Sequence, residues 1–233
     1  MALLRRNADR IEQVYLHDHL GAKRTARLQQ ALMDSGVDIE HTDEMKLESL
    51  TGTTKHQGVA AVVEAAAPMS EAEARHYLKA LERPLLLVLD GIEDPRNFGA
   101  CLRTADAVGV DLVVTARNRN VGFTPAVSKV AAGAAEVQPV AQVGNLARFL
   151  EFLKETGIWL VGTDQAAPQP IFEADLTQPV AIVLGSEGRG LRRLTRERCD
   201  ILAQIPMLGT VDSLNVSVAA GVCLYECLRQ RAI

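Results

Sequence analysis

The sequence predicts an α/β protein whose larger part is a mostly parallel sheet with helices on both faces. Short runs that are apolar at every position, such as residues 85–89 and 180–183, alternate with segments of helical periodicity. Fully apolar runs are typical of strands that are buried on both faces of a parallel sheet. The amphipathic segments between these runs supply helices that can cover the two faces.

The composition is that of a globular protein, with 48% hydrophobic and 23% charged residues in a chain of 233. No apolar run reaches the roughly 18 residues of a membrane-spanning helix. The N-terminal segment lacks the apolar core of a signal peptide, so we expect a cytoplasmic protein. The net charge of −4 does not indicate nucleic-acid binding, although a local basic patch is sufficient for such binding.

Residues 1–66 are predicted to form a small α/β unit, and residues 67–82 a linker to the second unit. The expected elements are a helix over 2–10, a strand over 12–16, a helix over 22–35 that Gly36 ends, a strand over 37–40, a helix over 44–50 and a strand over 58–63. Ser70 is expected to cap a short charged helix within the linker. Lys23, Arg24 and Arg27 are interpreted either as contacts for RNA phosphate or as a solvated helix face.

Residues 83–233 are predicted to form the second unit, in which strands and helices alternate. Strands are expected over 85–89, 112–115, 137–143, 158–162, 180–184 and 201–205, and helices over 97–108, 124–136, 145–156, 191–199 and 213–231. Thr124 is expected to cap the second helix, with Pro125 at its first position. Ser213 is expected to cap the last helix, which places Asn215 in the first turn near free N–H donors.

The histidines and cysteines exclude several kinds of chemistry. All five histidines precede residue 83, so the second unit has no internal Ser-His-Asp triad and no histidine base. His17 and His19 lack the further ligands that a metal site needs, and no HExxH motif is present, so no metal is expected. The four cysteines form no CxxC pair and are expected to be reduced, buried thiols.

A run of arginines occupies one short segment of the second unit. The residues are Arg189, Arg192, Arg193, Arg196 and Arg198. We interpret the run as a contact for RNA phosphate or another negatively charged partner, with a solvated helix face as the alternative.

Three stretches of the second unit carry most of the information about function. They are NFGACLRTA at 97–105, LGSEGRGL at 184–191 and SLNVSVAAG at 213–221. In this order and spacing they resemble the three signature motifs of the SpoU family of RNA 2′-O-ribose methyltransferases, within the SPOUT superfamily. The resemblance covers residues 80–233. The stretches around 163–200 and 205–219 resemble the subgroup that methylates a guanosine ribose in 23S ribosomal RNA.

The resemblance implies further features of the protein. It implies a C-terminal trefoil knot, an N-terminal RNA-binding domain similar to ribosomal protein L30e, a homodimer and S-adenosyl-L-methionine as the methyl donor. The cofactor residues carried over are Gly185, Ile205 and Leu214, with Leu184, Met207 and Gly209 as neighbours. The catalytic set carried over is Arg103, Asn97, Glu187, Ser213 and Asn215.

Arg103 is the residue of this set whose chemistry can be argued directly. A guanidinium stays charged at neutral pH and is a poor base. We therefore expect Arg103 to hold a phosphate and to stabilise the negative charge that develops on the ribose oxygen.

Other functions remain open at this point. One is a transfer-RNA 2′-O-methyltransferase of the same family, and another is an RNA-binding ribosome-assembly factor without catalysis. A third is a nucleotide-dependent oxidoreductase built on the glycines of 185–190, but their GxxGxG order is the reverse of the GxGxxG fingerprint.

Overall fold

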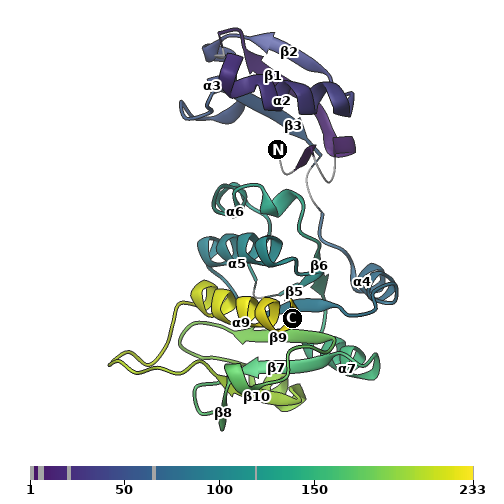
Figure 1. The fold of residues 1–233 in the computed structure, drawn as a ribbon, viewed down its shortest axis with the longest axis vertical. Helices are drawn as coiled ribbons and strands as arrows, with labels where there is room; N and C mark the ends of the chain where they lie inside the picture. The colour runs from purple at the N-terminus through teal and green to yellow at the C-terminus, as the bar shows by residue number, and fades with distance from the viewer. Residues whose placement is uncertain (1–2, 5–7, 20–21, 65–66, 119, 233) are drawn as a thin grey trace. The chain divides into compact units, whose positions relative to one another are not determined.

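The structure, a computed structural model, describes residues 3–4, 8–19, 22–64, 67–118 and 120–232 (Figure 1), without the side chains of residues 22–25. The chain divides into two compact units, Met1–Ala66 and Ala67–Ile233, which we call unit 1 and unit 2. Within the described residues, no helix has both the length and the apolar character needed to cross a membrane.

Unit 1 is a three-stranded sheet with two helices. Its elements are η1 (Ala8–Arg10), β1 (Ile11–His17), α2 (Ala22–Ser35), β2 (Ile39–Thr42), α3 (Glu44–Thr51) and β3 (Val59–Val63). The strand order is β2-β1-β3, with β2 parallel and β3 antiparallel to the central strand. The core of the unit contains Ile11, Val14, Leu16 and Leu32, so the small alternating unit expected from the sequence is present.

Some expectations for unit 1 concern residues that are not described. Of the helix expected over 2–10, residues 2 and 5–7 lie outside the described residues, and Ala8–Arg10 form a short 3-10 helix instead. The side chains of Lys23 and Arg24 also lie outside the described part of the chain. Arg27 is exposed on α2.

The segment expected to be a linker, residues 67–82, is instead packed on unit 2. The backbone N–H of Met69 donates to the carbonyl of Val140, at 2.7 Å. Ser70 caps α4 (Glu71–Leu78) through a capping box with Glu73, as expected for a short helix at this place. Ala74 and Leu78 are four residues apart, share one helix face and are buried against the sheet. This short apolar face is masked in the sequence by the charged residues around it.

Unit 2 is built on one sheet of seven parallel strands. The strands are β4 (Leu85–Asp90), β5 (Leu112–Ala116), β6 (Val140–Val143), β7 (Trp159–Thr163), β8 (Gln169–Pro170), β9 (Val180–Gly185) and β10 (Ile201–Gln204). Their order is β6-β5-β4-β9-β7-β10-β8. Every pairing between them is parallel, so the predicted fold class is confirmed.

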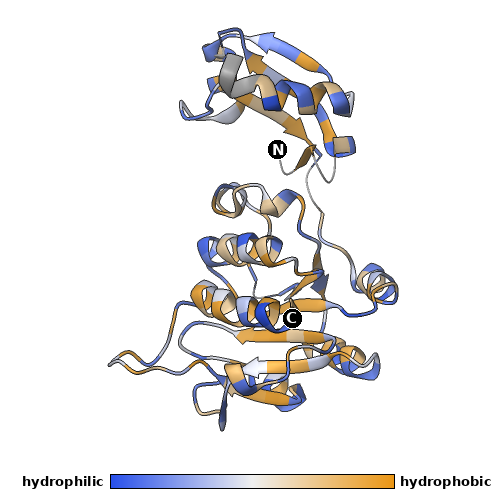
Figure 2. Cartoon of the chain, in the orientation of Figure 1, coloured by the Kyte–Doolittle hydropathy of each residue, from blue (hydrophilic) through white to orange (hydrophobic). Residues whose placement is uncertain are grey.

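Helices cover both faces of this sheet. They are α4, α5 (Pro95–Val108), α6 (Pro125–Ala131), α7 (Leu146–Glu155), α8 (Arg193–Arg198) and α9 (Val216–Arg231). Leu85, Leu87 and Leu89 of β4 join a core that includes residues of α5, α6 and α9. Leu86 and Val88 point to the opposite face and join a core with α4 and α7. The alternation explains why the strands are apolar at every position (Figure 2).

One predicted helix of unit 2 is interrupted. The helix expected over 124–136 ends at Ala131, because Ala132 and Gly133 both have positive φ, at 52° and 94°. A 3-10 turn over Ala134–Glu136 follows, and β6 begins only at Val140. Thr124 caps α6, and Pro125 takes its first position, as the sequence predicts.

The cysteines are free thiols, as expected. Cys101, Cys223 and Cys227 are buried between the helices and the sheet, and Cys199 is partly buried. Burial raises the pKa of each of these four thiols to about 12. At neutral pH they therefore remain protonated and act as small apolar side chains.

Candidate functional site

The candidate site lies at the carboxyl ends of β4 and β9, where the strand order changes direction. From β4 the chain continues to β5 and β6 on one side, whereas β7, β10 and β8 lie beyond β9 on the other. Open parallel sheets bind ligands at such a switch point. A cavity of about 650 Å³ is present there, between the end of β7, the loop after β9, and the segment that joins β10 to α9.

The cavity collects most of the residues predicted to bind the cofactor. Leu184, Gly185, Ile205, Met207 and Leu214 all line it, as do two members of the predicted catalytic set, Glu187 and Ser213. Gly209 lies in the exposed loop before α9 and is not among the lining residues.

Gly185 is required by the path of the loop that follows β9. A Cβ atom at this position would lie 2.0 Å from the carbonyl carbon of Gly190, far inside contact distance. The loop folds back on itself, with the N–H of Gly190 donating to the carbonyl of Ser186 at 2.9 Å. Gly188 and Gly190 have φ of 77° and 64°, which favours glycine. The glycines therefore let the loop fold tightly against the end of β9.

A hydrogen-bond network joins the three sequence motifs. The side-chain amide of Asn97 donates to Oε1 of Glu187 at 3.0 Å, and that of Asn215 donates to the same oxygen at 2.5 Å. The Asn215 amide also donates to Oδ1 of Asn97 at 2.9 Å. The backbone N–H of Val216 points at the Glu187 carboxylate as well, at 3.4 Å. Residues separated by more than 100 positions in the chain are thus fixed around one carboxylate oxygen.

The last helix begins two residues later than expected, so the interpretation of Ser213 as its cap is wrong. Asn215 is the N-cap of α9, and its Oδ1 accepts from the N–H of Ser217 at 3.0 Å. The amide group of the same side chain is held by Glu187 and Asn97, which fixes Asn215 at this junction. Ser213 remains in the loop, exposed on the wall of the cavity.

Asn97 and Arg103 lie on α5, but only Asn97 belongs to the network. Asn97 is buried in the first turns of the helix. Arg103 is exposed and lines neither of the two cavities described in this section and below. Gly99, between them, lets α6 approach closely, because a Cβ atom there would lie 2.8 Å from the carbonyl oxygen of Val127.

The run of arginines after β9 is mostly engaged within the protein. Arg192 pairs with the buried carboxylate of Asp90, donating through Nε at 2.6 Å. The other pairs are Arg193 with Glu197, Arg196 with Asp164, and Arg198 with Glu151. Among the described residues, Arg189 has no such partner and is exposed at the rim of the cavity. Of this run, Arg189 is thus the side chain left free for an external anion.

Several lining residues were not predicted as part of the site. They are Thr163, Asp164, Gln165, Arg196 and Asp212. The hydrogen bond from Arg196 holds the pKa of Asp164 below its usual value, so this carboxylate is charged at neutral pH. The signal that could have found them is positional, because residues 163–165 directly follow a buried parallel strand at the edge where ligands bind.

Comparison with known proteins identifies the family. Residues 84–225 match the SpoU rRNA Methylase family, and residues 1–69 match the family described as RNA 2′-O ribose methyltransferase substrate binding. The chain belongs to the SpoU rRNA methylase family. The three motif segments that meet at the cavity all lie within the first match.

Individual relatives extend over nearly the whole chain. The 23S rRNA (guanosine-2′-O-)-methyltransferase RlmB of Shewanella oneidensis is 46% identical over 99% of this chain and 94% of its own length. The protein of the same name from Coxiella burnetii is 49% identical over 95% of this chain and 89% of its own.

A solved member of the family has the same fold. The crystal structure of the SpoU methyltransferase AviRb from Streptomyces viridochromogenes in complex with AdoMet superposes with a TM-score of 0.74 at 25% identity. The superposition covers 95% of this chain and 83% of that one. The trefoil knot that the family resemblance implies stays a prediction for this chain.

Proposed function

We propose that this chain is an S-adenosyl-L-methionine-dependent methyltransferase that methylates the ribose 2′-OH of a guanosine in 23S ribosomal RNA. The observation that carries the proposal is the network of Asn97, Glu187 and Asn215, which joins the three SpoU motifs beside one cavity. The names of the relatives from Shewanella oneidensis and Coxiella burnetii support the choice of guanosine and of 23S rRNA.

The cavity suits the proposed cofactor in size and chemistry. Its volume of about 650 Å³ is in the range of small-molecule sites. Leu184, Ile205 and Leu214 offer an apolar wall for an adenine ring. The backbone of Gly185 and Met207 offers hydrogen-bonding groups close to the ligand, because Gly185 has no side chain in the way. The carboxylates of Glu187 and Asp212 suit a cationic sulfonium.

The protein's contribution to the reaction is positioning and electrostatic stabilisation. S-adenosyl-L-methionine supplies an activated methyl group when bound. The Oε1 atom of Glu187 already accepts from two side-chain amides and faces a backbone N–H, so we assign Glu187 a role in holding the loop, and Asn97 and Asn215 the same role. Ser213 offers a hydroxyl on the cavity wall. Arg103 is the cation we assign to the RNA phosphate and to the charge on the 2′-oxygen.

A homodimer would complete this site. Arg103 lies outside the cavity of its own chain, so the cation must come from a second copy or through movement of the RNA. Helix α9 exposes an apolar face, with Val218 51%, Tyr225 54% and Leu228 38% exposed. This helix contacts α5, which carries Arg103. We therefore propose that two copies associate through α9 and α5 and that each supplies Arg103 to its partner's cavity.

We propose that unit 1 binds the RNA substrate. The match of residues 1–69 to a substrate-binding family of RNA 2′-O-ribose methyltransferases supports this role. Unit 1 has its own sheet and core, so it can act as a separate binding module beside the methyltransferase unit.

The direct test is methyl transfer from labelled S-adenosyl-L-methionine to unmodified 23S rRNA, followed by mapping of the modified ribose. We expect a single 2′-O-methylguanosine. Transfer to transfer RNA instead would favour the alternative substrate, and RNA binding without transfer would favour an assembly factor. Failure to bind S-adenosyl-L-methionine would contradict the proposal as a whole.

A variant tests the assignment of Arg103. Arg103→Ala is expected to lower the transfer rate roughly 100-fold or more, as loss of one charge-stabilising group does, with cofactor affinity unchanged. Lys129→Ala removes an exposed cation from the neighbouring helix α6 and serves as the control. Equal rates for the two variants would remove Arg103 from the mechanism.

A further inference from the structure

The cations of unit 2 are distributed unevenly between its two edges. On the side where the strands begin, most cationic side chains are engaged: Lys154 with Asp200, Arg229 with Glu226, and Arg231 with four backbone carbonyls. On the side where the strands end, three arginines have no hydrogen-bond or ion-pair partner among the described residues. They are Arg96, Arg117 and Arg189.

These three arginines follow three adjacent strands. Arg117 is the first residue after β5, Arg96 lies in the first turn of α5 after β4, and Arg189 lies in the loop after β9. The strands are neighbours in the order β5-β4-β9. Neighbouring strands are about 4.8 Å apart, so the three positions form a row along the carboxyl edge that spans about 10 Å before the side chains extend.

The acidic residues of the same edge do not cancel this row. Asp90 is neutralised by Arg192, and Asp164 by Arg196. The carboxylate of Asp94 caps α5 and accepts from the backbone N–H of Arg96. Glu93 is exposed there and opposes part of the charge.

A second cavity, of about 510 Å³, lies at this edge beside the first. The loop after β9 separates the two, because its residues up to Leu191 line the first cavity and those from Arg192 line the second. The second cavity is also lined by Ala116 and Asn118 after β5, and by Gly144 and Asn145 after β6. Its wall combines the charge of Arg193, the amide of Asn118 and the half-exposed side chain of Leu194.

We infer that the substrate RNA crosses the carboxyl edge of this sheet, from the first cavity over the ends of β4 and β5. Its phosphates lie on Arg189, Arg96 and Arg117, and a nucleotide that flanks the methylated one enters the second cavity. The inference rests on the proposed function and extends it, since it gives the RNA a path over unit 2. Unpaired arginines suit phosphate because the guanidinium can donate two parallel hydrogen bonds, and phosphate contacts set the register of a nucleic acid.

The test is the salt dependence of binding between the full-length protein and an unmodified 23S rRNA fragment. The double variant Arg96→Ala/Arg117→Ala leaves the first cavity intact. Each lost phosphate contact on a single strand lowers the slope of log affinity against log salt by about 0.7, so the double variant should lose about 1.4. Between 1 M and 0.1 M salt this is about a 25-fold loss of affinity relative to the unaltered protein.

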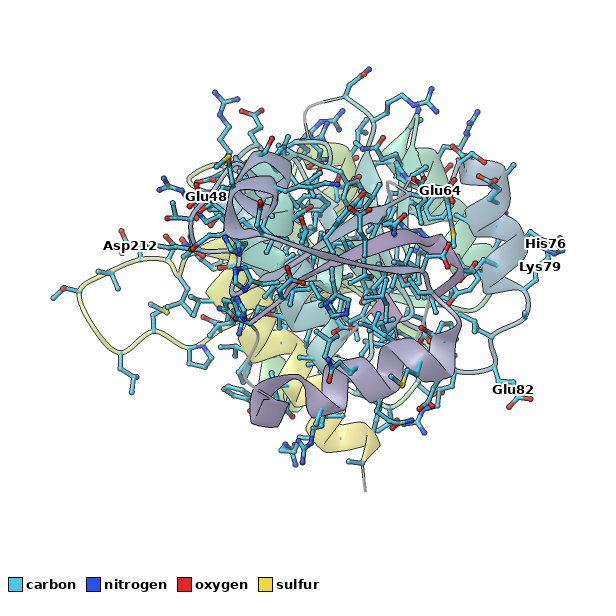
Figure 3. All side chains as sticks on the ribbon, turned by 90° about the horizontal axis from the view of Figure 1, so that it is seen from above. Glu48, Glu64, His76, Lys79, Glu82 and Asp212 are labelled. Carbon is cyan, nitrogen blue, oxygen red and sulfur yellow. The ribbon has the colours of Figure 1, made fainter. Side chains whose placement is uncertain are left out.

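The matched control is Lys79→Glu. It changes the net charge by the same two units, and Lys79 is an exposed cation that follows α4. Lys79 and Asp212, which lines the first cavity, lie at opposite sides of unit 2 (Figure 3). We expect the control to keep the slope of the unaltered protein. A double variant with that same slope would overturn the inferred path.

A second variant tests the second cavity alone. Ala147→Trp places a large side chain into it from α7, and we expect roughly tenfold weaker RNA binding, comparable to the loss of one stacked base, with unchanged binding of S-adenosyl-L-methionine. Unchanged RNA affinity would remove this cavity from the path. If the unaltered protein neither binds nor methylates the RNA, the proposed function itself fails, whereas methylation with unaffected variants overturns the path alone.

Discussion

At the level of single residues, the carboxylate of Glu187 is the centre of the site. One of its oxygens accepts from Asn97 and Asn215, and the first N–H of α9 points at it. A charged acceptor stabilises such donors more strongly than a neutral one. The positive end of the α9 dipole adds to this effect, because the carboxylate lies at the N-terminus of that helix.

We predict that Glu187→Ala loosens this junction. Removing the carboxylate leaves the amides of Asn97 and Asn215 without their shared acceptor, and we expect a loss of about 1–2 kcal/mol in the free energy of unfolding. Cofactor affinity should fall as well, because Glu187 and the loop it holds line the cavity. Thermal unfolding and calorimetric titration with S-adenosyl-L-methionine measure the two effects. Glu93→Ala removes an exposed glutamate without a described partner, and a Glu187→Ala protein that matches it would refute the role.

At the level of elements, the loop after β9 depends on a glycine that cannot be replaced. We predict that Gly185→Ala prevents the loop from closing, because the new methyl group would meet the backbone of Gly190 and Leu191 within 2.3 Å. Cofactor binding should be lost, with a destabilisation of about 1–3 kcal/mol from the overpacking. The control is Gly122→Ala, where the added methyl group meets open space. Retained cofactor affinity in the Gly185→Ala protein would show that the loop can rearrange.

The elements themselves could largely be predicted from the sequence, for a physical reason. Strands such as β4 and β9 are buried on both faces, so each of their side chains had to be apolar. The helix over 22–35 was predicted with its observed bounds. The errors occurred where few residues decide the outcome. The positive φ of Ala132 is invisible in composition, and the buried face of α4 consists of only Ala74 and Leu78.

The site could be predicted in part. The motif resemblance indicated the residues of the three segments, but not that Asn97, Glu187 and Asn215 would share one oxygen, because that contact depends on how distant strands and helices meet. Asp164 and Arg196 were missed for the same reason. They are 32 positions apart, and their ion pair forms only when β7 and α8 are placed in the fold.

At the level of the whole molecule, the position of Arg103 argues for assembly. Its side chain is exposed on α5, whereas the residues proposed to bind the cofactor line a cavity that it does not reach. Exposed apolar side chains continue from α9 into the loop before it, where Leu208 is fully exposed and Val211 is 61% exposed. A chain with this much apolar surface beside an incomplete site is well suited to pair with a second copy.

We predict that Val218→Glu/Tyr225→Glu converts a dimer into a monomer, because two charges would have to be buried in an apolar contact. Sedimentation should show half the mass of the unaltered protein, and methyl transfer should fall roughly 100-fold or more, to the level of Arg103→Ala. Binding of S-adenosyl-L-methionine should persist, since neither side chain lines the cavity. Met33→Glu/Met45→Glu places the same charges on exposed methionines of unit 1 and should leave the mass unchanged. A monomeric variant that still transfers methyl groups at the full rate would show that each chain is a complete enzyme and that Arg103 acts within its own subunit.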